Sequence, residues 1–157
     1  LLPALIAKFH DGYMLNTSAA AAATPTMTKL FYPKWWLEEV GFLPFSPLAC
    51  GLLTGKYQNG ALPEGSRMAI NGDLGGRKGP RAFAAVDAYL KVAEDFGLDP
   101  VHMALAWSAR RPFVSSSIFG ATTVAQLERS LGAADVTLSD ELLEKLDEVH
   151  RAHPLPY

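Results

Sequence analysis

The sequence has little of three things that decide what a protein can bind: cysteine, net charge and long apolar runs. Its 157 residues include one cysteine, Cys50, so an internal disulfide is excluded and no second cysteine is present to share a zinc ion. With 14 basic against 16 acidic residues, the formal net charge of −2 gives no electrostatic reason to bind nucleic acid or an anionic membrane. No apolar run approaches the ~18 residues that span a bilayer. We therefore expect a cytoplasmic protein with neither membrane nor nucleic acid as partner.

The N-terminal segment is the least readable part of the chain. It begins with Leu1, lacks the basic flank of a secretory signal and enters an apolar stretch at once, which predicts a fragment of a longer protein. An alanine run at 19–23 favours a helix, but Pro25 soon ends it. Residues 1–35 are therefore assigned to no element. The length and the apolar share of 49% allow one domain with a sizeable core.

Helical spacing dominates the rest of the chain. Asp99, Thr123 and Ser139 stand at N-cap positions, and Gln126 lies three residues after Thr123, as in a capping box. Gly97 follows an apolar pattern and marks the end of a helix. The pattern predicts helices over about 35–40, 80–96, 100–110 and 139–151, with a further one starting at 124.

Two short apolar segments predict strands, Phe42 to Leu48 and Phe113 to Phe119. Strands that alternate with helices indicate βα units around a parallel sheet. Two units are too few to close a barrel. The segment from Gly51 to Pro80 is rich in glycine and proline and poor in apolar residues, so it predicts a long loop instead of core.

Two segments have the features of an anion site. In the first, an apolar strand breaks at Pro47 into a turn of small residues followed by Lys56, and backbone amides with a nearby lysine bind phosphate. In the second, Gly120 to Thr123 opens a helix, where free amides and the helix dipole favour an anion. In a (β/α)8 barrel the loops after strands seven and eight often form the phosphate site.

Other readings of these residues are less favoured. A P-loop is disfavoured because Gly51 and Gly55 are one residue too close and Tyr57 replaces the hydroxyl that binds magnesium. Cys50 as a nucleophile needs a base, and the sequence shows none beside it. His150 and His153 fit a solvated helix end better than a metal site, since no third ligand is suggested. The glycines at 72, 75, 76 and 79 do not form a Rossmann fingerprint.

The two segments resemble signatures of one enzyme family. Ser46 to Tyr57, SPLACGLLTGKY, resembles the strand-seven signature of aldo-keto reductases, and Gly120 to Leu127, GATTVAQL, resembles their strand-eight signature. The segments at 97–100, 103–107 and 133–139 are also similar to the family, most closely to its bacterial Tas-like branch. Potassium-channel β subunits share a closely similar Ser-Pro-Leu-Ala-Cys-Gly segment.

The resemblance implies an α/β protein of the (β/α)8 TIM-barrel class. Residues 36–157 would supply its C-terminal portion: strands seven and eight with their helices, and at most part of strand six. It implies NADP(H)-dependent reduction of an aldehyde or ketone, with a small carbonyl compound as substrate. The family's catalytic aspartate, tyrosine, lysine and histidine lie on the first four strands, so no residue here receives a catalytic role, and no metal is implied.

Two alternatives stay open. The chain is also compatible with a cofactor-sensing regulatory protein like a potassium-channel β subunit. It is equally compatible with an inactive fragment that self-associates through exposed barrel edges.

The resemblance also implies roles for single residues. Ser46 to Cys50 would follow the nicotinamide ribose and pyrophosphate, Lys56 would contact phosphate, and Arg67 would contact the 2′-phosphate. Gly120, Thr122 and Gln126 would hold the adenosine end, and Ser130 stands where the family often has an asparagine that reaches the adenine. The complete set of expected cofactor-binding residues is Phe45, Ser46, Pro47, Leu48, Ala49, Cys50, Lys56, Arg67, Gly120, Thr122, Gln126 and Ser130.

Overall fold

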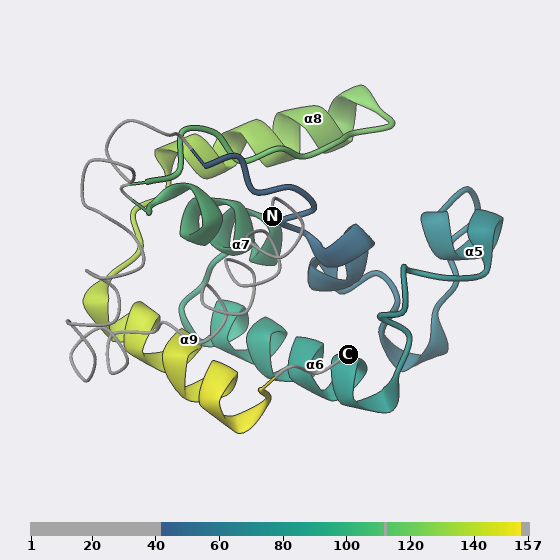
Figure 1. Ribbon diagram of the computed structural model, residues 1–157, viewed down its shortest axis with the longest axis horizontal. Helices are drawn as coiled ribbons and strands as arrows, with labels where there is room; N and C mark the ends of the chain where they lie inside the picture. The colour runs from purple at the N-terminus through teal and green to yellow at the C-terminus, as the bar shows by residue number, and fades with distance from the viewer. Residues whose placement is uncertain (1–41, 112, 155–157) are drawn as a thin grey trace, which may run out of the picture. The chain divides into compact units, whose positions relative to one another are not determined.

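The computed structural model describes residues 42–111 and 113–154, which lie in the second of the two units into which the chain divides, Phe42–Tyr157 (Figure 1). Residues 1–35 and the helix expected over 35–40 lie outside the described residues. In chain order the elements are η1 (Ala49–Thr54), η2 (Gln58–Gly60), α5 (Arg67–Asn71), α6 (Pro80–Asp95), α7 (Pro100–Ala109), α8 (Val124–Leu131), η3 (Gly132–Asp135) and α9 (Asp140–Ala152).

The predicted long helices are confirmed, and α7, α8 and α9 are capped by the expected side chains. The Asp99 carboxylate accepts the Val101 amide hydrogen at 2.7 Å at the start of α7. The Thr123 hydroxyl accepts the Gln126 amide at 3.2 Å at the start of α8, and Ser139 begins α9 in the same way. Each cap satisfies an amide that has no partner inside its helix.

The two predicted strands are wrong as continuous elements. Among the described residues the segments meet only at isolated parallel bridges, Phe42 with Val114 and Phe45 with Ile118. The second bridge lies three residues further along the first segment and four further along the other, so the register slips by one. Pro44, between the bridges, has no amide hydrogen to donate and only accepts, from Ile118 at 2.8 Å. The slip and the missing donor together interrupt the ladder.

The prediction of a long loop without core at 51–80 is also wrong. Leu52, Tyr57 and Leu74 in this stretch are almost completely buried, and Met68 packs with them. They form one hydrophobic cluster with Val86 of α6. The segment is irregular and exposes Leu62 and Ile70, yet its other large apolar side chains form a packed core.

Helix α7 is the centre of the described unit and contacts α6, α8, η1 and η3 (Figure 1). Its apolar residues surround the whole helix, as is typical of a buried helix. Val101 and Leu105 pack with Ala133 and with Leu48, next to the first predicted site segment. Helix α9 packs on α6, and its Leu142 and Leu146 are buried in one cluster with residues of α6 and with Met103 of α7. Within residues 42–111 and 113–154, no helix is both long and apolar enough to cross a membrane.

Candidate functional site

The turn from Ser46 to Gly51 has a strained backbone. Ser46, Ala49 and Cys50 have φ values of 59°, 48° and 59°, in the left-handed region that disfavours residues with a Cβ by about 1–2 kcal/mol each. Hydrogen bonds within the turn hold this conformation: the Ala49 amide donates to the Ser46 carbonyl at 2.9 Å, and the Gly51 amide donates to the Leu48 carbonyl at 2.8 Å. Strained backbone of this kind is concentrated at functional sites, so the turn is a candidate on geometry alone.

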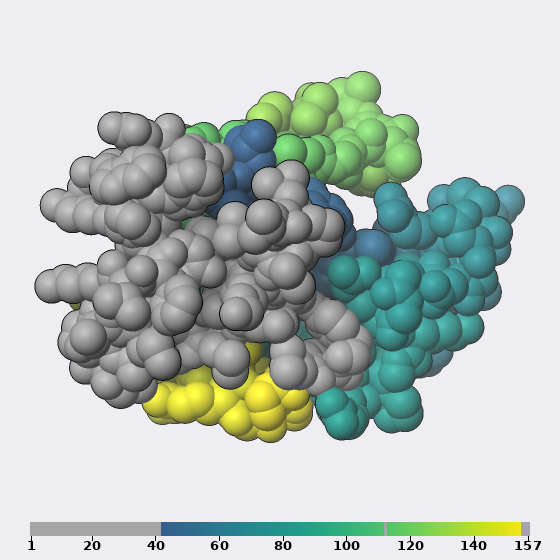
Figure 2. Space-filling view, viewed as in Figure 1, coloured from purple at the N-terminus to yellow at the C-terminus, as the bar shows by residue number. Residues whose placement is uncertain are grey.

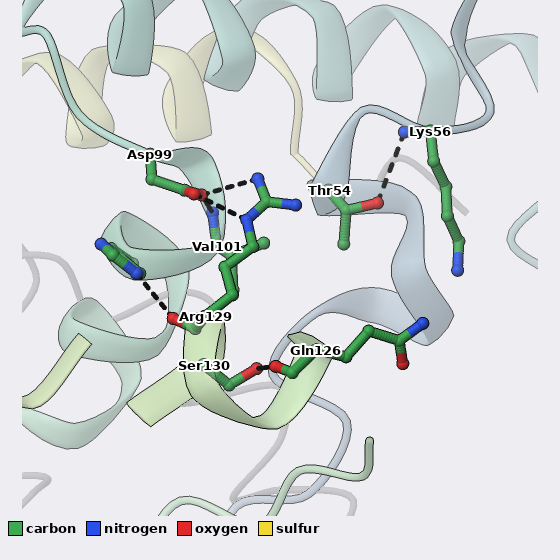
Figure 3. A network of polar contacts seen from close by, with 8 residues as sticks. Thr54, Lys56, Asp99, Val101, Gln126, Arg129 and Ser130 are labelled. Atoms are coloured by element: carbon green, nitrogen blue, oxygen red, sulfur yellow. Dashed lines mark hydrogen bonds and ion pairs between the residues drawn. The ribbon is translucent and has the colours of Figure 1, made fainter. Parts of the chain in front are cut away.

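Gly51 makes room for the Lys56 side chain. Its φ of 94° favours glycine, and a Cβ there would lie 2.9 Å from Lys56 Cε and 3.1 Å from Lys56 Nζ. The Thr54 hydroxyl donates to the Gly51 carbonyl at 2.8 Å and accepts the Lys56 amide at 3.4 Å (Figure 3). The absence of a side chain at residue 51 therefore lets the ammonium group lie close to the turn.

Two arginines approach the same turn from the following segment. Arg67 Nη1 lies 3.9 Å from the Cys50 sulfur, and Arg77 Nη1 lies 3.8 Å from the same atom. With Lys56, the turn is thus flanked by three cationic side chains, which we call the cation cluster: Lys56, Arg67 and Arg77. The sequence did not single out Arg77, because its place depends on how the segment after α5 folds back.

The fold of that segment has a clear cause. The Asp73 carboxylate accepts the amides of Gly75 and Gly76 at 2.9 and 3.3 Å, which closes a tight turn. Backbone hydrogen bonds from Leu74 and Gly76 hold the pKa of Asp73 below its ordinary value. Leu74, fully buried, anchors the turn in the core. The consequence is that Arg77, three residues after Leu74, reaches Cys50.

The two arginines therefore have separate supports. Arg67 is the first residue of α5, whose start is capped by Ser66. The amide of Met68, the next residue, donates to the buried Tyr57 hydroxyl at 3.4 Å. Tyr57 follows Lys56 directly, so one buried phenol connects the lysine end of the turn to the arginine of α5.

The second predicted segment, at the start of α8, has its own closed geometry. The Gln126 side-chain carbonyl accepts both the amide and the hydroxyl hydrogen of Thr122 at 3.0 Å. The expected capping box is thus half formed: Thr123 caps the helix, whereas the glutamine bonds Thr122 instead of Thr123. Residues 120–129 are all exposed. In Figure 3 the Gln126 side chain extends from α8 toward the side on which Lys56 lies.

The remaining predicted residues differ in exposure. The Phe45 ring is 77% exposed, so it is free to contact a flat ligand. Leu48 packs into the core beside α7, which leaves its backbone as the part that can face a ligand. Ser130 is buried, and its hydroxyl donates to the Gln126 carbonyl of the same helix at 2.8 Å.

The structure thus gathers the first segment and Arg67 at one turn and places the second segment on a separate helix. In the space-filling view an open gap separates α8 from the part of the chain that includes α5 (Figure 2). In the described part of the chain, no group of three histidine, cysteine or carboxylate side chains could hold a metal ion.

The residues present fit a dinucleotide with several phosphates. Three cations stand at a turn where Gly51 removes a Cβ, which suits a polyanion. The exposed Phe45 ring suits an aromatic group, and Gln126 suits a polar one. This donor set is compatible with a ligand that carries phosphates and an aromatic group.

The sequence is similar to known proteins over most of its length. The model of the Aldo/keto reductase family matches residues 27–151. Protein tas of Escherichia coli is 40% identical over 119 residues, which cover 76% of this chain and 34% of that protein. Probable voltage-gated potassium channel subunits beta of Arabidopsis thaliana and of Oryza sativa are 35% and 34% identical over 129 residues, covering 79% of this chain and 39% of each relative. The chain therefore spans little more than a third of the length of these relatives. Since the match covers most of its residues and includes both site segments, the chain belongs to the aldo/keto reductase family.

Proposed function

We propose that this chain binds NADP(H) and forms the cofactor-binding part of an oxidoreductase that reduces aldehydes or ketones. The observation that supports the proposal is the cation cluster at the strained turn, in a chain of the aldo/keto reductase family. When bound, the nucleotide supplies the hydride that passes to the carbonyl carbon. The described residues of this chain bind and orient the nucleotide, and none of them is proposed as proton donor.

The roles of the binding residues follow from their places. The cation cluster would neutralise the phosphates. The guanidinium groups of Arg67 and Arg77 can each bind two phosphate oxygens, and the Lys56 ammonium acts as a point charge. The Phe45 ring would lie against the nicotinamide, since it is exposed and next to the turn. Gln126 would contact the adenosine end from α8.

A second candidate function is regulation in response to the nucleotide. It is favoured by one observation, that two of the relatives reported above are named as potassium channel subunits. In that case the same site would bind NADP(H) and alter the affinity for a protein partner, with little or no turnover.

The binding proposal is tested by titrating NADPH into the full chain and following the quenching of tryptophan fluorescence. We expect saturable quenching, and about a tenfold weaker affinity for Lys56→Ala, because one phosphate loses its charged partner. Lys91→Ala is the matched control: it removes a lysine that pairs only within α6, with Glu94 and Asp95, and should leave the affinity unchanged. A folded chain whose fluorescence does not respond to NADPH would contradict the proposal.

Turnover separates the two candidate functions. The longer protein that contains this sequence, if it is a reductase, should oxidise NADPH when given a simple test aldehyde. NADPH-dependent binding to a membrane-protein partner without aldehyde reduction would support the regulatory function instead.

A further inference from the structure

Helices α7 and α8 are joined by a paired contact between an aspartate and an arginine. Arg129 Nε donates to Asp99 Oδ2 at 2.6 Å, and Arg129 Nη2 donates to Asp99 Oδ1 at 2.9 Å (Figure 3). Two parallel hydrogen bonds fix the direction of the guanidinium as well as its distance. The same Asp99 carboxylate caps α7 through the Val101 amide, so its own position is fixed by the helix that it begins.

A histidine makes the return contact from α7 to the same residue. His102 Nε2 lies 2.6 Å from the Arg129 carbonyl oxygen. Because a carbonyl only accepts, Nε2 is the donor. Arg129 lies in the last turn of α8, where carbonyl groups lack a partner within their helix. One residue of α8 is thus held twice by α7, through its side chain and through its backbone.

Gly132 shows that the approach of the histidine constrains the chain. Its φ of −57° is helical, a conformation that any residue adopts, so the backbone does not require glycine here. A Cβ at this position would lie 2.8 Å from His102 Nε2 and 2.9 Å from His102 Cε1. A side chain at residue 132 would therefore require the imidazole ring to move away from the Arg129 carbonyl.

Apolar packing contributes little to the placement of α8. Val124, Leu127 and Leu131 are spaced as one helical stripe, yet they are 72%, 43% and 58% exposed. Ser130 is the buried residue of this helix. With so little apolar surface buried, the directional contacts from Asp99 and His102 determine where α8 lies on α7.

The Asp99–Arg129 contact is an ion pair at neutral pH. Partial burial raises the pKa of Asp99. The hydrogen bonds from Arg129 and from the Val101 amide lower it by more, so the pKa lies below its ordinary value. The Asp99 and Arg129 side chains are 27% and 45% exposed, so the pair is shielded from water only in part.

We infer that Asp99, His102 and Arg129 are positioning residues that fix α8 on α7 and thereby hold Gln126 in place for the adenosine end of the nucleotide. Gln126 lies three residues before Arg129, on the same short helix, so a shift of α8 moves both. The inference rests on the proposed function, which supplies the ligand. None of the three residues is proposed to touch it.

The test compares two probes whose phosphates bind at the cation cluster, of which only one carries an adenosine group that can reach α8. Adenosine 2′,5′-bisphosphate carries the end that α8 would hold, and inorganic pyrophosphate needs only the cation cluster. We expect Arg129→Ala to weaken binding of the adenosine compound about tenfold and to leave pyrophosphate affinity within about twofold. Asp99→Asn, which keeps a capping side chain but loses the charge, should act in the same direction. Lys91→Ala, which removes an ion pair inside α6, is the control and should change neither.

A second measurement follows α8 directly. Amide hydrogen exchange in Arg129→Ala should become faster at 121–131 and stay unchanged in α9. Equal weakening of both probes would indicate a merely structural role and would overturn the inference, as would unchanged binding of the adenosine compound. The wild-type chain and Lys56→Ala are measured first, and a wild type that binds neither probe would overturn the proposed function itself together with this inference.

Discussion

At the scale of single residues, the most telling feature is that two guanidinium groups approach the Cys50 sulfur. Arg67 and Arg77 lie ten positions apart, on opposite sides of the turn made by Asp73, yet both come within 4 Å of that atom, at 3.9 and 3.8 Å. Two cations that approach the same atom repel each other, and a bound anion would offset that repulsion. A phosphate at this place would be such an anion.

Arg67 is the residue that the family resemblance assigns to the 2′-phosphate. Arg67→Ala should therefore weaken NADPH binding by roughly tenfold and NADH binding by less than about twofold, since NADH lacks that phosphate. Calorimetric titration of both nucleotides measures the ratio. Arg151→Ala, at an exposed position of α9, is the control of equal charge change. An equal loss of affinity for the two nucleotides would assign Arg67 to a shared phosphate instead.

At the scale of elements, the contact between α7 and α8 reverses the usual effect of a glycine substitution. At a helical φ, replacing glycine with alanine normally raises the free energy of unfolding by about 0.5–1 kcal/mol. At residue 132 the new Cβ would collide with the His102 ring, so we expect Gly132→Ala to lower the free energy of unfolding by about 1 kcal/mol. Urea unfolding measures the difference.

Two further variants make that prediction specific. Gly79→Ala places a Cβ in open space at ordinary φ and should have little effect. In a His102→Ala background the ring is gone, and Gly132→Ala should no longer destabilise. If Gly132→Ala stabilises the wild type, the ring does not approach residue 132 as described.

The elements also show what the sequence could predict. Helices α6, α7, α8 and α9 were predictable because periodicity and N-caps such as Asp99 and Ser139 act within a few residues of the chain. The core around Tyr57 and the place of Arg77 were not, because they depend on contacts between distant parts of an irregular segment. The strand prediction was wrong at Pro44, because proline has no amide hydrogen to continue the ladder that the apolar pattern indicates.

At the scale of the molecule, two loops more than sixty residues apart in sequence are proposed to form one binding site. The first, 46–56, lies against α7 through η1, and the second, 120–126, lies on α7 through α8. Helix α7 is thus the shared support of both. A ligand that binds both loops would therefore affect both at once, whereas a ligand that binds one loop would leave the other unchanged.

The most direct test is to map the amide resonances of the ¹⁵N-labelled chain during titration with NADPH. The account predicts that resonances from 46–56 and from 120–126 shift together along one saturation curve, whereas those of α9 do not move. Shifts confined to one of the two loops, or no shifts at saturating nucleotide in a folded chain, would contradict the claim that they form a single cofactor site.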